Sequence, residues 1–458
     1  MALGRRYHFV GINGSGMSGL ALFLLALGKE ISGSDLKWSL EADHLSRLGA
    51  SVHVGHAREH ISDDLDGVIV SSAIPSDNVE IVAARERGVP VVRRLHAVAL
   101  LLEEYSSIGV VGSHGKSTTT AMTATLLREL GFSPSYLVGA HCPNLGGNAH
   151  LGEGTWFVAE VDESDGLFTE IRPTVAVLTN VGKDHLQTYR SEAAIREAFR
   201  RYVLPAERAV LSIDDDRVRE IASEVPSAIT VGLCAEAQIR AVDVRHEKFQ
   251  TSFELVIRGE SLGRRWITAP GTHNVRNALC ALGAAMAAGA DPAAAADALG
   301  ALSLPHRRFE ILEENGVTVV DDFAHTPEEV EATLRAIRDG WVGRRIVAVF
   351  QPHRYTRTQS MGQDFGRAFS GADVVIVTNI YSACEHPVPG VSSAGIVDAV
   401  LDTTDSAVYS IPNKEEVVSL LKALIRPGDF IISFGAGDIW TVTEELAHFL
   451  KEGSFCVV

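Results

Sequence analysis

The chain has 458 residues, which predicts about three domains at roughly 150 residues each. Hydrophobic residues make up 46% and charged residues 22%, and this composition excludes a disordered, collagen-like or coiled-coil chain. Lys and Arg number 41 against 58 Asp and Glu, so the net charge of −17 argues against binding to nucleic acid or to an anionic membrane surface.

The cysteines and the apolar runs indicate the cellular compartment of the protein. The five cysteines are scattered and form no C-x-x-C pair, which fits a reducing cytoplasm better than a zinc cluster or a redox dithiol. The longest apolar runs, at 17–28 and 279–290, fall short of the roughly 18–20 residues that a membrane span needs. We therefore expect a cytoplasmic protein without a spanning helix, as a monomer or a homodimer.

The first part of the chain alternates strand-like and helix-like segments. Strands that are separated by helices pair in parallel, so this order predicts a Rossmann-like domain over residues 1–105. The expected strands are 7–12, 30–33, 67–71 and 90–92, and the expected helices include 17–27 and 79–87.

A second strand, loop and helix series begins at Ile108–Val111 and ends near Gly131. It predicts a central domain over residues 106–304, similar to P-loop ATPases and built on a mostly parallel sheet. The expected strands are 156–161, 175–179 and 209–212, followed by a β-rich insert at 249–257 and an Ala-rich region at 278–302 in which Asp291-Pro292 separates two helices.

The last third alternates again and predicts a C-terminal Rossmann-like α/β domain over residues 305–458. The expected strands are 317–320, 345–350, 374–378 and 430–434, with a helix at 328–338.

The strongest chemical signal is the loop from Gly112 to Thr118, which lies between an expected strand and an expected helix. Glycines in such a turn let backbone N–H groups converge on phosphate oxygens, while Lys116 neutralises the phosphates and the Ser117 hydroxyl ligates Mg²⁺. Val110 stands where the strict P-loop pattern has a glycine. The pattern favours a nucleoside triphosphate site over an ordinary glycine turn.

A weaker signal is the loop from Gly11 to Gly16, which has Asn13 in place of the second glycine of a dinucleotide loop. Asp35 follows at the spacing expected for a carboxylate that binds a ribose hydroxyl. By itself this loop fits a dinucleotide, another nucleoside diphosphate or a structural turn.

A set of motifs over nearly the whole chain resembles the Mur ligase family. Within that family the resemblance is to the branch that joins L-alanine to UDP-N-acetylmuramic acid, and the last motif is the most telling for this branch. The motifs are HFVGINGSGMS at 8–18, GSHGKSTT at 112–119, AEVDESD at 159–165, Thr179-Asn180, Asp184-His185, GTHNVRN at 271–277, HRRF at 306–309, DDFAHTP at 321–327 and FQPHRYTR at 350–357.

The resemblance implies an ATP-dependent ligase that forms an amide bond through an acyl phosphate, in peptidoglycan synthesis. It assigns UDP-sugar binding to the first domain, with Asp35 at the ribose, and ATP binding to the loop at Gly112, with Asn277 at the adenine. The implied UDP-sugar site comprises Gly11, Gly14, Ser15, Gly16, Met17, Ser34, Asp35 and Ser71. The implied ATP site comprises Gly112, Ser113, His114, Gly115, Lys116, Ser117, Thr118, Asn180, Asn277, Arg308 and Asp322.

The resemblance also implies a metal site and an amino-acid site. Ser117, Glu160 and His185 are expected to hold Mg²⁺ or Mn²⁺, and Lys116, Glu160 and His185 to be catalytic. Taken alone, Glu160 and His185 read as solvated or internally bonded side chains. The amino acid is expected at His325, His353, Arg354 and Arg357, whose arginines can grip a carboxylate, although they also fit an exposed basic turn.

Phe323 departs from the tyrosine, and Thr326 from the histidine, that are usual in the L-alanine branch. Three rival functions stay open at this point. The nearest is a ligase that joins the same UDP-sugar to murein tripeptide, favoured by residues 149–153 and 322–325. A nicotinamide dehydrogenase would leave Lys116 without a role, and a non-catalytic UDP-sugar sensor would not need the lysine or the metal ligands.

Overall fold

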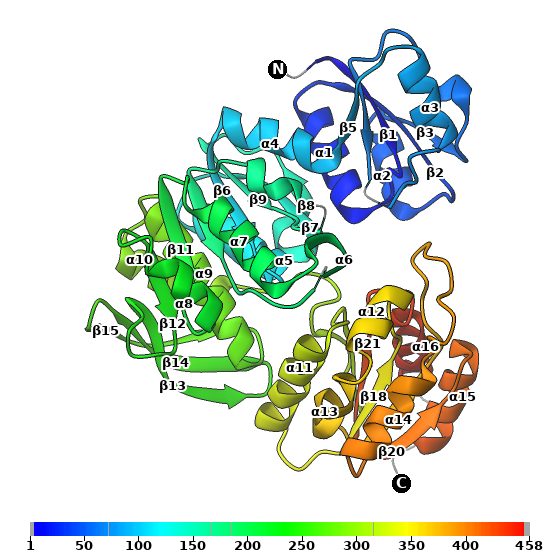
Figure 1. Cartoon of the computed structure of the whole chain (residues 1–458). Coiled ribbons are helices and arrows are strands. Elements are labelled where there is room, and N and C mark those ends of the chain that lie inside the picture. Colours follow the sequence, from blue (N-terminus) through cyan, green and yellow to red (C-terminus); the bar gives the residue numbers. More distant parts are fainter. Residues whose placement is uncertain (1–3, 72, 165, 185, 315, 453–458) are drawn as a thin grey trace. The chain divides into compact units, whose positions relative to one another are not determined.

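The computed structural model describes residues 4–71, 73–164, 166–184, 186–314 and 316–452. These residues contain three β-sheets with helices packed against them (Figure 1). The chain divides into two compact units. Residues 1–243, 253–267 and 275–305 form the first unit, and residues 244–252, 268–274 and 306–458 form the second. The prediction of three α/β domains is confirmed, with the first two sheets built mainly by the first unit.

The N-terminal sheet has five parallel strands in the order β3-β2-β1-β4-β5. Side chains alternate along β1, so Tyr7 and Phe9 join the core that includes α1, while Val10 joins the core that includes α3 on the opposite face. The elements are β1 (Arg6–Val10), α1 (Ser15–Ala26), β2 (Glu30–Asp35), α2 (Leu40–Arg47), β3 (Ser51–Val54), η1 (Arg58–His60), β4 (Gly67–Val70), α3 (Val79–Glu86), β5 (Val91–Arg93) and α4 (Arg94–Glu104).

The central sheet has ten strands in the order β15-β14-β13-β12-β11-β10-β6-β9-β7-β8. Its middle strands are parallel, and β8 is an antiparallel edge. The strands are β6 (Ser106–Val111), β7 (Ser135–Cys142), β8 (Gly147–His150), β9 (Trp156–Glu160), β10 (Val175–Leu178), β11 (Arg208–Ser212), β12 (Ile229–Gly232), β13 (Ile239–Glu247), β14 (Gln250–Ile257) and β15 (Glu260–Ile267).

The helices of the central region include the long α5, which follows the loop at Gly112. Asp291 caps α10 through its side chain and Pro292 occupies the first turn, so the predicted break in the Ala-rich region is confirmed. The helices are α5 (Lys116–Glu129), α6 (Leu186–Tyr189), α7 (Glu192–Val203), α8 (Asp216–Ala222), α9 (Thr272–Ala287) and α10 (Pro292–Asp297).

The C-terminal sheet has six strands in the order β16-β17-β21-β18-β19-β20, parallel except for the β16 edge. Val347 and Val349 of β18 pack with α15 and α16, whereas Phe350 points to the other face and makes tilted ring contacts with Phe365 and Phe369. The elements are β16 (Glu310–Glu313), β17 (Thr318–Asp322), α11 (Pro327–Gly340), β18 (Ile346–Phe350), α12 (Tyr355–Met361), α13 (Phe365–Ala368), β19 (Val374–Val377), α14 (Ala394–Thr403), β20 (Ala407–Ser410), α15 (Lys414–Leu424), β21 (Phe430–Phe434) and α16 (Trp440–Lys451).

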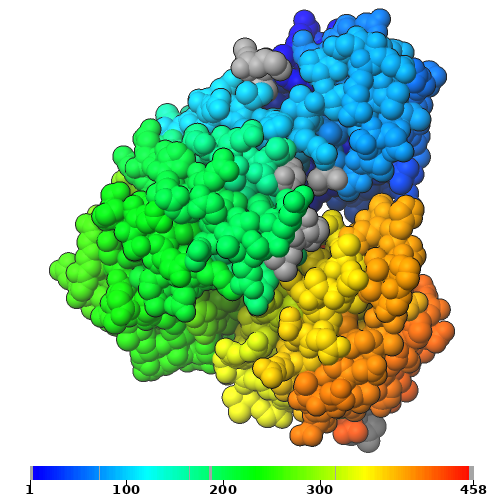
Figure 2. Space-filling model, viewed as in Figure 1, coloured from blue at the N-terminus to red at the C-terminus, as the bar shows by residue number. Residues whose placement is uncertain are grey.

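Within the first unit, the N-terminal and central domains pack directly on each other. Helix α1 contacts β7 and β8, and the rings of Phe23 and Phe157 lie 5.1 Å apart. Figure 2 shows the blue and cyan-to-green surfaces of these two domains meeting. Among the described residues, no helix combines the length and the apolar character that crossing a membrane requires.

Candidate active site

The loop at Gly112 joins β6, an inner strand of the central sheet, to the N-terminus of α5. Gly112 has a φ of +141° and Gly115 a φ of +81°, which side-chain-bearing residues rarely adopt. A Cβ at Gly115 would lie 2.5 Å from Oδ1 of Asn277, and one at Gly112 would lie 2.0 Å from Oγ1 of Thr179. The glycines therefore allow the positive-φ backbone of this turn and the close approach of Thr179 and Asn277, in a strand-to-helix loop of the kind that binds phosphate at a helix N-terminus.

Lys116, the first residue of α5, directs its ammonium back across this loop. Its Nζ donates to the carbonyls of Gly112 at 2.7 Å and Ser113 at 3.3 Å, and it lies 3.0 and 2.9 Å from the two carboxylate oxygens of Glu163. Burial opposes a charge on Lys116, but Glu163, Glu160 and Asp162 raise its pKa. The ammonium therefore stays charged beside the loop.

Glu160 ends β9, next to β6 in the sheet, and faces the start of α5. Its Oε2 accepts a hydrogen bond from the Ser117 hydroxyl at 2.7 Å and from the Gly139 amide at 2.9 Å. A Cβ on Gly139 would lie 2.4 Å from this oxygen, so a larger residue there would displace the Glu160 carboxylate from its present position. A carboxylate and a hydroxyl at this distance are the hard oxygen donors that Mg²⁺ or Mn²⁺ prefers, and these residues fit such an ion.

The third predicted metal ligand, His185, lies outside the described residues. Its neighbour in the same motif, Asp184, is described.

Asn180 and Asn277, both predicted at the ATP, contact the loop from two directions. Oδ1 of Asn180 accepts from the His114 amide, and its Nδ2 donates to the His114 carbonyl, each at 2.9 Å. Oδ1 of Asn277 accepts from the Thr119 hydroxyl at 3.3 Å. Asn180 thus fixes the loop backbone at His114, whereas Asn277 bonds to the first turn of α5.

The loop at Gly11 follows β1, the central strand of the N-terminal sheet. The carbonyl of Ser34 accepts from the amides of Gly11 at 2.9 Å and Ile12 at 3.1 Å, and Oδ2 of Asp35 accepts from the Asn13 amide at 3.0 Å. The end of β2 therefore fixes the loop. The hydroxyl of Ser34 is fully buried and turned toward α3, whereas its carbonyl serves the loop.

The remaining residues predicted at the UDP-sugar lie around the same turn. Ser71 follows β4 and donates its backbone N–H to the Val10 carbonyl at 3.3 Å. Ser15 begins α1 and donates its hydroxyl to the Gly139 carbonyl of the central domain at 2.7 Å, while Met17 is buried in the core.

Two residues at this loop were not predicted from the sequence. A Cβ at Gly16 would lie 2.9 Å from Nη1 of Arg94, so a guanidinium stands directly beside the loop. Nδ2 of Asn148 donates to the Ser15 carbonyl at 2.7 Å. The only sequence signal for Arg94 is a basic residue at a strand end, which is too common to single it out.

In the C-terminal unit, the residues predicted at the amino acid come together. Nη1 of Arg357 lies 3.0 Å from Nδ1 of His353, and the His325 and His353 rings are 5.8 Å apart. Tyr381, which was not predicted, stacks on His353 at 5.7 Å. Arg354 caps α12 with a φ of +72°, and its Nε is buried without a hydrogen bond to any described residue.

Arg308 and Asp322, predicted at the ATP, also lie in the C-terminal unit. The carboxylate of Asp322 accepts from the amides of Phe309 at 2.8 Å and Ala324 at 2.7 Å. Burial raises the pKa of Asp322 to about 6, although nearby Arg308 lowers it in part. The Arg308 guanidinium lies 4.7 Å above the Phe323 ring, a cation–π contact that gives this phenylalanine a role.

Comparison with known proteins identifies the class that this fold and these loops define. Residues 6–106 match the Mur ligase family, catalytic domain; residues 110–285 match the Mur ligase middle domain; and residues 307–437 match the Mur ligase, glutamate ligase domain. The chain belongs to the Mur ligase family.

Individual relatives indicate which members of the Mur ligase family this chain is similar to. The UDP-N-acetylmuramate--L-alanine ligase of Pelotomaculum thermopropionicum is 43% identical over 454 residues, which are 98% of each chain. The enzyme of the same name from Pelobacter propionicus is 42% identical over 98% of this chain and 99% of its own. The crystal structure of the UDP-N-acetylmuramate-alanine ligase from Thermotoga maritima is 28% identical, with a TM-score of 0.84 over 98% of this chain and 100% of that one. A murein peptide ligase from Psychrobacter arcticus shares the fold, at 22% identity and a TM-score of 0.71.

Proposed function

We propose that this chain is an ATP-dependent ligase that joins the lactyl carboxylate of UDP-N-acetylmuramic acid to the amino group of L-alanine, in peptidoglycan synthesis. The observation that carries the proposal is the identity of over 40% to ligases of that name along 98% of both chains. The fold alone would not select this reaction, because murein peptide ligases share it.

The chemistry requires activation, since a carboxylate oxygen is a poor leaving group. The lactyl carboxylate attacks the γ-phosphorus of ATP, ADP leaves, and an acyl phosphate forms. The amine of alanine then attacks the acyl carbon, and inorganic phosphate leaves as the amide bond forms. Catalysis of such a transfer depends mainly on positioning and on charge stabilisation.

The loop from Gly112 to Thr118 is proposed to bind the ATP phosphates, with Lys116 neutralising the group in transfer. This is supported by the two positive-φ glycines of the strand-to-helix turn and by the charged ammonium beside it. Ser117, Glu160 and His185 would hold Mg²⁺ or Mn²⁺, which when bound screens phosphate charge. Asn180, Asn277, Arg308 and Asp322 complete the proposed ATP site.

The amino-acid site is proposed at His325, His353, Arg354 and Arg357. Arg354 and Arg357 stand on one end of α12, where two guanidiniums can grip one carboxylate. The base that takes the proton from the amine is proposed among His185, His325 and the departing phosphate.

The UDP-sugar is proposed to bind the N-terminal domain at the loop from Gly11 to Met17, with Ser34, Asp35 and Ser71. The proposed domain limits are 1–105, 106–304 and 305–458, for UDP-sugar, ATP and amino acid respectively. We place this activity in the cytoplasm, because ATP is its energy source and the described cysteines are free thiols.

The test is phosphate release with ATP, Mg²⁺ and UDP-N-acetylmuramic acid, with L-alanine or L-alanyl-γ-D-glutamyl-diaminopimelate as the acceptor. Release with alanine is the expected result, and release with the tripeptide alone would make the chain a ligase for murein peptide. No release with either acceptor, from protein that binds ATP in calorimetry, would exclude ligation of this UDP-sugar and favour a binding role.

A further inference from the structure

A cluster of imidazoles and one carboxylate lies inside the N-terminal domain, among residues to which the proposed function assigns no role. His8 is on β1, His60 ends η1, and Glu80 is in the first turn of α3. His8 and Glu80 are fully buried, on a face of the sheet that is otherwise covered by Val10, Val68 and Ile81. Carboxylates are almost never fully buried unless they are paired or bind a metal. Glu80 is surrounded by three imidazoles, the Ser34 hydroxyl and the Ala57 amide.

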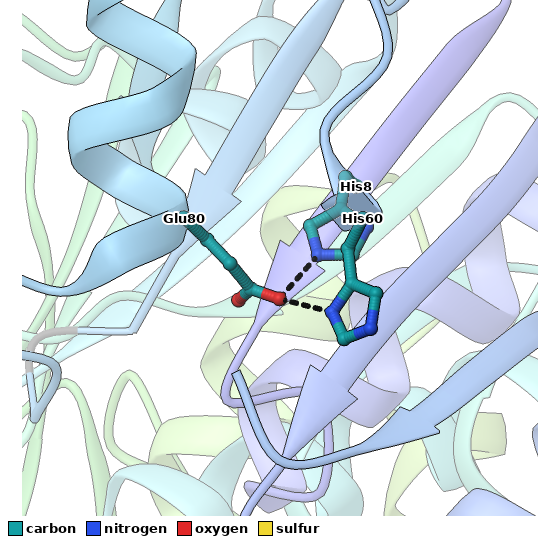
Figure 3. Close-up of side chains that lie close together, drawn as sticks. All are labelled: His8, His60 and Glu80. Carbon is teal, nitrogen blue, oxygen red and sulfur yellow. Dashed lines mark hydrogen bonds and ion pairs between the residues drawn. The ribbon is translucent and has the colours of Figure 1, made fainter. Parts of the chain in front are cut away.

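Three side-chain atoms that could bind a metal, one each from His8, His60 and Glu80, lie close together (Figure 3). Nδ1 of His60 lies 2.6 Å from Oε1 of Glu80, and Nε2 of His8 lies 3.5 Å from the same oxygen. All three atoms are within 4.8 Å of one another. Nε2 of His8 makes no hydrogen bond to any described residue although it is completely buried. Nε2 of His8 therefore contacts Glu80 only at ion-pair distance, and it can bind a cation placed between the two side chains.

The surroundings orient these side chains as a metal site requires. The other ring nitrogen of His8, Nδ1, lies 2.9 Å from the Ser32 hydroxyl, which sets which nitrogen faces Glu80. The other carboxylate oxygen of Glu80 accepts from the Ser34 hydroxyl at 2.5 Å and lies 3.0 Å from Nδ1 of His56. Outer partners of this kind fix both the tautomer and the carboxylate rotamer of metal ligands.

We propose that His8, His60 and Glu80 form a Zn²⁺ site with a water molecule as the fourth ligand. Two imidazole nitrogens and one carboxylate oxygen suit Zn²⁺, whereas Mg²⁺ and Ca²⁺ prefer all-oxygen sites. Ligand atoms at about 2.1 Å from a tetrahedral ion stand about 3.4 Å apart. The 3.5 Å spacing between His8 and Glu80 already fits, whereas the 2.6 Å contact between His60 and Glu80 has to open by roughly 0.8 Å when the ion binds. The site is separate from the proposed phosphate-bound metal, and it does not depend on the proposed function.

The ion would join three elements that are distant in sequence. It ties β1, η1 and α3 together, and Glu80 reaches the glycine loop through Ser34, whose carbonyl holds the amides of Gly11 and Ile12. Binding energy at such a site adds directly to the stability of the fold.

The test uses the full chain after removal of metal by a chelator, followed by one equivalent of Zn²⁺ or Co²⁺. Zinc retained after gel filtration, the visible absorption of four-coordinate Co²⁺ and the thermal unfolding midpoint are measured. The wild type is expected to keep one zinc per chain, to give the intense cobalt bands, and to unfold at a higher temperature with zinc. His60→Asn, which alters a half-buried ligand, is expected to lose all three effects.

Two control variants make the result decisive. His53 stacks on His60 at 4.2 Å without belonging to the triad, so His53→Asn is expected to keep the zinc. Glu160→Gln tests whether the zinc occupies the proposed phosphate-bound site, and it too is expected to keep the zinc. Absence of zinc in the wild type, retention in His60→Asn, or loss in Glu160→Gln alone would each overturn the proposal.

Discussion

At the scale of single residues, Lys116 and Glu163 form an ion pair beside the proposed phosphate loop. The ammonium is engaged by a buried carboxylate and by two loop carbonyls. In the proposed function, an ATP phosphate in the loop would compete with Glu163 for this charge. Because the two carbonyls and Glu163 hold the Lys116 ammonium in place, it is a fixed cation at the loop and not a mobile side chain.

We expect Lys116→Ala to lower kcat for phosphate release by about a thousandfold or more, because the transferring phosphoryl group loses its cation. Lys422→Ala removes a lysine of α15 that pairs with Glu445, and serves as the matched control with unchanged kcat. Normal turnover in Lys116→Ala would refute the assignment of this loop.

Arg354 combines backbone strain with a proposed role in substrate binding. Its φ of +72° and ψ of 140° belong to a region that is almost exclusive to glycine, at a cost on the order of 1–3 kcal/mol. Strain of this kind persists where the surroundings enforce it, and it is common at functional sites.

A pair of variants separates the two effects at Arg354. Both Arg354→Ala and Arg354→Gly remove the guanidinium, so both are expected to raise KM for L-alanine at least tenfold. Only glycine relieves the backbone, so Arg354→Gly is expected to exceed Arg354→Ala in unfolding free energy by about 1 kcal/mol. Urea unfolding and steady-state kinetics measure these quantities, and equal stability of the two variants would argue against strain.

Asp322 predicts a pH dependence of stability. Because burial raises its pKa from 3.8 to about 6, its contribution to stability is complete below pH 3.8 and is lost as the pH rises through 6. Asn at this position does not ionise and escapes that loss. We expect the stability of Asp322→Asn relative to the wild type to increase by about 1–2 kcal/mol between pH 5 and pH 8.

Unfolding free energies over this pH range test the prediction. Asp405→Asn, at an exposed aspartate, provides the reference for a substitution at the surface. A difference between Asp322→Asn and the wild type that falls with rising pH would contradict the proposed direction of the pKa shift.

At the scale of elements, the sequence predicted many of the strands with continuous apolar runs, but it missed the inner strands β7, β12 and β13 of the central sheet as well as several edge strands. Strands such as Val374–Val377 and Phe430–Phe434 are fully buried, and their continuous Val, Ile and Phe runs identify them. The edge strands β3 and β20 have mixed side chains with partial exposure and gave no such signal. The hydrophobic pattern of the sequence therefore indicates which segments are buried. It predicts a strand only where that strand is buried.

The parts of the candidate site that could be predicted from the sequence are those whose residues stand together in one short motif. The loop at Gly112 was found because its glycines, lysine and hydroxyl are contiguous. The cluster of His8, His60 and Glu80 was not found, because its members come from three elements that only the parallel sheet brings together. The partnership of Lys116 with Glu163 was missed for the same reason.

The start of α11 shows how an element positions the proposed amino-acid site. Thr326 accepts from the Glu329 amide at 3.4 Å, and Glu329 accepts from the amides of Thr326 at 3.3 Å and His325 at 3.0 Å. This capping box fixes the backbone of His325. Thr326 stands where the L-alanine branch usually has a histidine, and its structural function here is to cap α11.

We expect Thr326→Ala to lower the unfolding free energy by about 1 kcal/mol, because the N-terminus of α11 loses its cap. Thr326→Ser keeps the hydroxyl and should stay within a few tenths of the wild type. Urea denaturation compares the two, and equal losses in both variants would mean that the methyl group, not the cap, matters.

At the scale of the whole molecule, each domain is proposed to bind a different substrate. The reaction needs the three substrates in contact, and an acyl phosphate hydrolyses unless water is kept out. Domains that deliver separate substrates meet these needs by closing around them.

We therefore expect a smaller radius of gyration in small-angle X-ray scattering when a non-hydrolysable ATP analogue and UDP-N-acetylmuramic acid are added together. UDP-N-acetylmuramic acid alone is the control, because it engages only the N-terminal domain in this proposal and leaves the C-terminal domain without a ligand to close on. Calorimetry under the same conditions establishes that both ligands are bound. A scattering curve that does not change with both ligands bound would mean that the acyl phosphate is protected without domain movement, and the shielding of the intermediate would then have to come from the loops of the site itself.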